Sequence, residues 1–183
     1  MKTTILNGNP NPGNTAFDGY LGNLKVDMES RGHLVVVCTL RELEIKHCIG
    51  CFGCWVKTPG ECFVKDDSAT IRKEYINSDL VLFASPVIMG FTSALLKKVH
   101  EKFLPLIHPY FELVNGEVHH LPRYDKYPLM ALLLEKGADC DQDDIDIITD
   151  IYRRDAINLK TNFSFMGLTS QSVQEVANEI DHI

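Results

Sequence analysis

The sequence predicts an α/β fold in a single domain, residues 1–183, built on a five-stranded, doubly wound parallel sheet. One observation is that short apolar runs alternate with longer segments whose apolar residues recur at helical spacing. Another is that several of the short runs are apolar throughout, as expected for strands covered by helices on both faces. This alternation favours the strand order 2-1-3-4-5, in which ligands bind at the carboxyl ends of the first and third strands.

The first three strands are expected at three apolar runs. Thr3–Asn7 is β-branched and apolar, and Gly8 and Pro10 end it. His33–Leu40 and Asp79–Pro86 are continuous apolar runs, which are typical of buried parallel strands.

Helices are expected after each of these strands. Asn14 or Thr15 can cap the first helix, and Gly32 can end it. A second helix is expected from about Ser68 to Tyr75, and Ser93 can cap a third. The buried face of the first helix carries four residues at helical spacing: Phe17, Leu21, Leu24 and Met28.

The second half of the chain continues the alternation. Pro128–Glu135 is expected as the fourth buried strand, and Asp143 and Asp144 favour a helix start after it. Thr161–Leu168 is expected as the fifth strand, and Ser172–Glu175 has the spacing of a capping box for a last helix. The segment 108–128 interrupts the pattern, and its "NG" pair predicts a hairpin.

Composition excludes several classes of function. With 45% hydrophobic and 23% charged residues and no apolar run near the roughly 20 residues of a membrane span, we expect no membrane partner. A net charge of -7 without a basic patch indicates no nucleic-acid partner. The start "MKTTILNGNP" lacks the apolar stretch of a secretory signal, so we expect a cytoplasmic protein.

The segment Asn7–Ala16, "NGNPNPGNTA", has the features of a phosphate-binding loop. Glycines and short polar side chains let backbone N–H groups approach a ligand, and a helix N-terminus follows with the positive end of its dipole. The loop lacks the lysine of a P-loop and the GxGxxG of a dinucleotide site, so a single phosphate such as that of FMN fits it better than ATP. The alternative is an ordinary Asn- and Gly-rich turn.

Three segments together carry a resemblance: "NGNPNPGNT", "CIGCFGCWVKTPGECFVKDD" and "SDLVLFASPVIMGFTSALLKK". In this order they resemble the NAD(P)H-dependent FMN reductases of the flavodoxin-like superfamily, especially the branch of iron–sulfur flavoproteins. The resemblance covers about the first 105 residues. It implies a flavodoxin-like three-layer sandwich that binds FMN, uses NAD(P)H as co-substrate and forms a homodimer or homotetramer.

The resemblance also implies which residues bind the flavin. Those for the phosphate are Asn9, Asn11, Asn14, Thr15 and Ala16. Those against the isoalloxazine ring lie in the loop after the third strand: Pro86, Val87, Ile88, Met89, Gly90 and Phe91. An apolar loop at the switch point suits a flat ring on physical grounds as well. The sequence departs from the family in two places, because "GNPN" lacks the arginine of the common "GSPR" and Val87 or Ile88 replaces an aromatic residue.

Cys48, Cys51, Cys54 and Cys62 form a C-x2-C-x2-C-x7-C series. In a reducing compartment such a series is a metal or redox site more often than a disulfide framework. The spacing resembles the ferredoxin arrangement around a [4Fe–4S] cluster. Zinc, a labile redox pair and free thiols are the alternatives.

The function expected from these features is that of an FMN-dependent oxidoreductase. It takes hydride from NAD(P)H and passes electrons to a flavin, a quinone or another small molecule, with no catalytic side chain. One alternative is an iron–sulfur flavoprotein that carries electrons through a [4Fe–4S] cluster and is fed by ferredoxin. The other is a non-enzymatic binding module with a zinc-bound cysteine loop.

Overall fold

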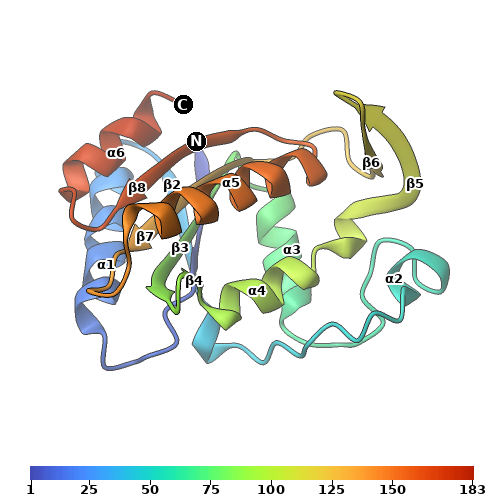
Figure 1. Ribbon diagram of the computed structural model, residues 1–183, viewed down its shortest axis with the longest axis horizontal. Coiled ribbons are helices and arrows are strands. Elements are labelled where there is room, and N and C mark those ends of the chain that lie inside the picture. Colours follow the sequence, from blue (N-terminus) through green and yellow to red (C-terminus); the bar gives the residue numbers. More distant parts are fainter.

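The computed structural model describes all 183 residues and has the three-layer architecture that the sequence predicts (Figure 1). The central sheet has the order β2-β1-β3-β7-β8, with parallel pairing throughout this path. This is the predicted order 2-1-3-4-5, which confirms the flavodoxin-like topology. The strands are β1 (Lys2–Asn7), β2 (Leu34–Thr39), β3 (Leu80–Ile88), β7 (Leu129–Glu135) and β8 (Phe163–Leu168).

Helices cover both faces of the sheet and enclose two cores. On one face α1 (Thr15–Ser30) packs beside α6 (Val173–Asp181), with Phe17, Leu21 and Ile180 fully or almost fully buried. On the other face lie α3 (Ser68–Ile76), α4 (Ala94–Glu101) and α5 (Gln142–Asn158). No helix is both long and apolar enough to span a membrane.

The helix ends follow the sequence signals. Asn14 caps α1, Ser93 caps α4, and Ser172 forms a reciprocal capping box with Glu175 at the start of α6. Gly32 follows α1 with a φ of 89°, a conformation that glycine adopts without strain. α5 begins at Gln142, just before the expected aspartates, because Asp141 caps it and accepts a bond from the Asp144 N–H.

Two further elements project from the side of the molecule away from α1 and α6 (Figure 1). One is the antiparallel hairpin β5 (Ile107–Val114) and β6 (Glu117–Pro122), whose turn residues Asn115 and Gly116 both have positive φ, as the "NG" pair predicts. The other is the cysteine segment, with the short α2 (Gly53–Val56). The fold also contains the short strand β4 (Phe91–Thr92) and the 3₁₀ helices η1 (Leu40–Glu42) and η2 (Leu104–Leu106).

Candidate functional site

Hydrogen bonds accepted by three asparagine side chains shape the loop after β1. The side-chain oxygens of Asn7, Asn9 and Asn11 each accept a bond from the backbone N–H two residues further on, at 3.0, 3.0 and 2.9 Å. These are Asx turns, in which a short side chain replaces a backbone acceptor. Three of them in succession lead the chain from the end of β1 to the start of α1.

The start of α1 offers two free backbone donors. Asn14 uses its side-chain oxygen to accept from the Phe17 N–H at 3.2 Å. The N–H groups of Thr15 and Ala16 have no protein acceptor, and both residues are exposed. Unsatisfied N–H groups at the positive end of a helix dipole are a general anion site.

The three predicted asparagines hold the loop in shape. Asn9 is fully buried, and its amide donates to the Asn14 carbonyl and to Asp18. Asn14 donates to Glu135 at the end of β7, with 2.6 Å between Nδ2 and Oε2. The Asn11 side chain accepts a hydrogen bond from the Gly13 N–H within the loop, and the residue is exposed. Among the five predicted residues, Thr15 and Ala16 are therefore the ones that present free backbone donors.

Arg41 reaches this loop from η1, although the loop itself contains no arginine. Its guanidinium donates to the Asn9 carbonyl at 3.4 Å and pairs with Asp18 at 2.9 Å. Burial raises the pKa of Asp18, but bonds from Asn7, Asn9 and Arg41 outweigh it and lower the pKa below its ordinary value. Arg41 could be placed here from the sequence only indirectly, through the parallel pairing of β1 and β2. This pairing sets Thr39 beside Asn7, so the residues that follow Thr39 lie next to the loop that follows Asn7.

The second expected loop, Pro86–Phe91, is a hairpin. β3 continues to Ile88 and pairs with β4 (Phe91–Thr92) through a two-residue turn. Met89 and Gly90 have φ of 52° and 73°, the left-handed conformations of a type I′ turn. The expected end of the strand at Pro86 was therefore too early, because the β-branched residues that follow it extend the strand.

The side chains of this hairpin alternate, as in any strand. Val87 is 9% exposed and packs into the core, so its side chain does not contribute to an outer wall. Ile88 is 41% exposed and Met89 is 94% exposed. An apolar surface for a planar ring is therefore offered by Ile88 and Met89, with Gly90 in the turn between the strands.

The two loops lie at the carboxyl ends of adjacent strands. Asn7 is in register with Ala84, and the Gly8 N–H donates to the Ala84 carbonyl at 2.8 Å. Gly8 allows a close approach, because a Cβ there would lie 2.6 Å from Leu96 Cγ. This is the switch point at which open α/β sheets bind ligands.

The four cysteines of the C-x2-C-x2-C-x7-C series surround one narrow cavity. Its volume is about 20 Å³, roughly the space of one water molecule. All six cysteines of the chain are free. Burial raises the pKa of Cys54, and the nearby Cys62, Cys48 and Cys51 raise it further. No group of three or more His, Cys, Asp or Glu side chains is placed to hold a single metal ion, so the geometry gives the zinc alternative no support.

Trp55 attaches this segment to the rest of the fold. Its indole N–H donates to the carbonyls of Leu104 and Ile107, both at 3.0 Å. Its ring also stacks on Phe52, with 5.3 Å between ring centroids. The cysteine segment is thereby held against η2 and the start of β5.

Buried charges lie directly behind Cys62. The Lys102 ammonium is 3.7 Å from the Cys62 sulfur and 3.0 Å from the Asp66 carboxylate. The side chains of Lys102 and Asp66 are 2% and 0% exposed. Burial opposes the ionisation of Asp66, but hydrogen bonds from Ser68 and Lys102 prevail and lower its pKa to about 2. Positive charge at this position suits a negatively charged centre at the thiols.

A larger cavity of about 440 Å³ lies between the cysteine segment and the β3–β4 hairpin. Cys48 lines it on one side and Phe91 on the other. His100 and Asp155 also line it, with 3.6 Å between Nδ1 and Oδ2. Burial lowers the pKa of His100 to about 3 and raises that of Asp155. Sequence reasoning did not single out this pair, because 55 positions separate its members and neither lies in a motif.

Two curated proteins resemble a part of the chain, whereas no family model matches it. An iron–sulfur flavoprotein of Methanocaldococcus jannaschii is 32% identical over 107 residues, which are 58% of this chain and 53% of that protein. An iron–sulfur flavoprotein of Archaeoglobus fulgidus is 31% identical over 108 residues, 59% of this chain and 48% of that protein. The matched part thus spans about half the length of these relatives.

Solved structures resemble the whole chain. An FMN-dependent NADH-azoreductase from Bacillus anthracis, solved in complex with FMN, superimposes with a TM-score of 0.63 at 11% identity, over 97% of this chain and 92% of that one. At this level of identity the likeness establishes the fold. The chain has the flavodoxin-like fold, and its resemblance to FMN reductases and iron–sulfur flavoproteins, expected from three sequence segments, is confirmed.

Proposed function

We propose that this protein binds FMN and is an oxidoreductase that transfers electrons from NAD(P)H to a small-molecule acceptor, such as a flavin or a quinone. Two neighbouring features carry the proposal: the free N–H groups of Thr15 and Ala16, and the exposed apolar hairpin at Ile88 and Met89. The first follows β1 and the second ends β3, and these two strands are adjacent in the sheet. A phosphate and a planar ring need these two environments side by side. The FMN-dependent azoreductase of the same fold supports this choice of ligand.

The residues present fit FMN in chemistry as well as in position. Thr15 and Ala16 would bind the phosphate through N–H groups at a helix end, where a dianion is stabilised. Ile88, Met89 and Gly90 would contact the ring through apolar surface and backbone groups. The flavin supplies the hydride chemistry, and the chain has to bind it, orient it and leave one face open for the nicotinamide. No side chain is required as an acid or base.

The exposed apolar side chains also bear on assembly. Ile88 and Met89 belong to the hairpin that would contact the ring, and they project from the surface of the isolated chain. Such side chains at a ligand site are commonly covered in the active assembly. We therefore propose a homodimer or homotetramer in which a neighbouring subunit completes the flavin site. The cytoplasmic location is proposed from the sequence alone.

A second candidate function is that of an iron–sulfur flavoprotein. One observation favours it: Cys48, Cys51, Cys54 and Cys62 line a single cavity, with the buried Lys102 ammonium beside it. In a [4Fe–4S] cluster each thiolate would bind a different iron, so the sulfurs need not converge on one point as they do around zinc. A cavity of about 20 Å³ is too small for the cube, so the segment would have to open to admit it. Ferredoxin is then the proposed electron donor.

The test begins with an absorption spectrum of protein purified without oxygen, together with flavin, iron and zinc analysis and reduction by NADH and NADPH. Flavin bands with little metal and fast bleaching by a nicotinamide support the reductase. Flavin bands over a broad iron–sulfur absorption, with about four irons per chain, support the electron carrier. Protein that contains no flavin and does not bind added FMN would contradict both.

A pair of variants at Thr15 tests the phosphate site directly. Proline is tolerated at the first position of a helix, so Thr15→Pro removes one free N–H with little structural cost. Thr15→Ala keeps the N–H and removes the hydroxyl. Loss of a charge-assisted hydrogen bond predicts FMN binding at least about tenfold weaker in Thr15→Pro than in Thr15→Ala. Equal affinities would show that the phosphate is not bound at this helix end.

A further inference from the structure

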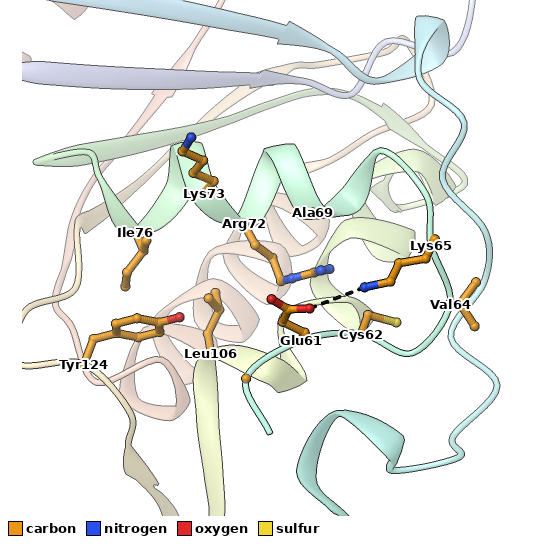
Figure 2. A pocket seen from close by; sticks show the side chains of 11 residues that line it. Glu61, Cys62, Val64, Lys65, Ala69, Arg72, Lys73, Ile76, Leu106 and Tyr124 are labelled. Atoms are coloured by element: carbon orange, nitrogen blue, oxygen red, sulfur yellow. Dashed lines mark hydrogen bonds and ion pairs between the residues drawn. The ribbon is translucent and has the colours of Figure 1, made fainter. Parts of the chain in front are cut away.

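A separate cavity of about 440 Å³ lies behind the cysteine segment, against α3 (Figure 2). Its walls come from residues 60–65, from the exposed side of α3, and from Leu106 and Tyr124. A volume of this size fits a small organic molecule. No residue of the phosphate loop or of the β3–β4 hairpin lines it, so it is distinct from the proposed flavin site.

Arg72 is a buried cation in this cavity without an acidic partner. It is 8% exposed, and Figure 2 shows its guanidinium directed toward the centre of the cavity. Nη1 donates to Ser68 Oγ at 2.8 Å and to the Lys102 carbonyl at 3.4 Å, and both acceptors are neutral. The guanidinium forms no ion pair with a carboxylate within 4.0 Å, and its Nε and Nη2 groups have no protein acceptor.

The nearby acids are already paired. Asp66 is bound to Lys102 at 3.0 Å, and Glu61, which lines the cavity, is bound to Lys65 at 3.3 Å. Buried charges in proteins are normally paired, because an isolated ion in a low-dielectric environment is costly. Asp66 reaches Arg72 only through the Ser68 hydroxyl, which donates to Asp66 and accepts from Arg72, so no carboxylate of the chain contacts the guanidinium directly.

The other residues that line the cavity indicate what kind of ligand it can bind. Lys65 and Lys73 add positive charge, so the cavity has an excess of cations in a protein whose net charge is -7. Ile76, Leu106 and the ring of Tyr124 give it an apolar side. Such a combination binds a molecule that carries an oxyanion on an apolar or aromatic body.

We propose that this cavity is a binding site for a small organic oxyanion, a carboxylate or a phosphate, with Arg72 as its anchor. The site shares Cys62 with the cysteine cavity, so a bound ligand contacts the same segment that carries the four thiols. The proposal goes beyond the oxidoreductase function and does not depend on it, because none of its residues takes part in the proposed flavin contacts.

The test is an NMR titration of the ¹⁵N-labelled protein, as purified, with benzoate and with phenyl phosphate, which share the aromatic ring and differ in the anion, at constant ionic strength. Saturable shifts are expected at residues of α3 and of 60–65. Arg72→Gln should weaken binding at least about tenfold, since it removes a charge-assisted bond. The probe that binds more tightly identifies the ligand as a carboxylate or a phosphate.

A second variant does not depend on the buried arginine. Ala69 is exposed on α3 and lines the cavity, so Ala69→Leu fills the space while it keeps a good helix former. Thr70 is its exposed neighbour outside the cavity, and Thr70→Leu is the matched control. We expect binding to be lost in Ala69→Leu and kept in Thr70→Leu.

Three results would overturn the proposal. The first is that neither probe gives saturable shifts at α3 in the unmodified protein. The second is that Ala69→Leu binds as tightly as Thr70→Leu. The third is binding only in metal-free protein that is abolished once an iron–sulfur cluster is present, because Arg72 would then balance the charge of the thiolate centre.

Discussion

Breaking the buried ion pair of Lys102 and Asp66 is expected to destabilise the protein strongly. The ammonium and the carboxylate are 3.0 Å apart, and the two side chains are 2% and 0% exposed. Asp66→Asn keeps the size of the side chain but leaves the ammonium buried without its partner. Removing one member of a buried pair costs about 3–5 kcal/mol, and we expect a loss in this range.

The pKa of Asp66 gives an independent magnitude. Its value falls from 3.8 to about 2, since hydrogen bonds from Ser68 and Lys102 outweigh the opposing effect of burial. These values differ by about 1.8, and one pKa unit corresponds to about 1.4 kcal/mol, so ionised Asp66 contributes about 2 kcal/mol at neutral pH. Because the folded-state pKa is the lower one, this stability is complete above about pH 4 and is lost as the pH falls toward 2.

Urea unfolding at pH 7 and at acid pH measures both effects, in samples of matched flavin and metal content. Glu29→Gln is the control, since Glu29 pairs with Lys25 at 3.8 Å and both side chains are about 40% exposed. Exposed pairs contribute about 0–1 kcal/mol. The reasoning is refuted if Asp66→Asn costs no more than Glu29→Gln, or if it leaves the acid-induced loss of stability unchanged.

Three further predictions concern the loops and the cysteine segment. Gly8→Ala should weaken FMN binding and lower the free energy of unfolding by about 1–3 kcal/mol, because the new Cβ would lie 2.6 Å from Leu96 Cγ. Fluorescence titration with FMN and urea unfolding measure the two effects, and wild-type values in both would contradict the prediction. Asn14→Ala should cost about 1 kcal/mol through the lost helix cap and should also weaken FMN binding, as the same two assays would show. Trp55→Phe should lower the free energy of unfolding by about 1–2 kcal/mol and raise the rate of amide hydrogen exchange around the cysteines, because the hydrogen bond to the Leu104 carbonyl is lost. Unchanged exchange rates would refute this prediction.

Much of the fold could be predicted because its signals are local. Apolar runs and helical periodicity located the five main strands and their helices, and alternation of the two predicted the order of the sheet. The reciprocal bonds of Ser172 and Glu175 and the turn at Asn115–Gly116 follow from pairs of residues with known backbone preferences.

The remaining features depend on contacts between distant segments or on backbone geometry. Met89 adopts a left-handed conformation that its side chain does not favour, so the turn after β3 has no strong sequence signal. Arg41 and the unpaired Arg72 are defined by neighbours far along the chain, at Asp18 and at Lys102. The contact of Asn9 with the flavin phosphate stays a prediction: its side chain is buried and bonded within the loop, and composition does not distinguish a side chain that binds a phosphate from one that shapes the loop around it.

The central claim is that the start of α1 binds the phosphate of FMN, and the affinities of FMN and riboflavin test it most directly. The two flavins share the ring and differ in the phosphate. Two charge-assisted bonds from Thr15 and Ala16 predict that FMN binds at least about a hundredfold more tightly, measured by fluorescence titration of flavin-free protein. Equal affinities for FMN and riboflavin, or no binding of either, would contradict the account.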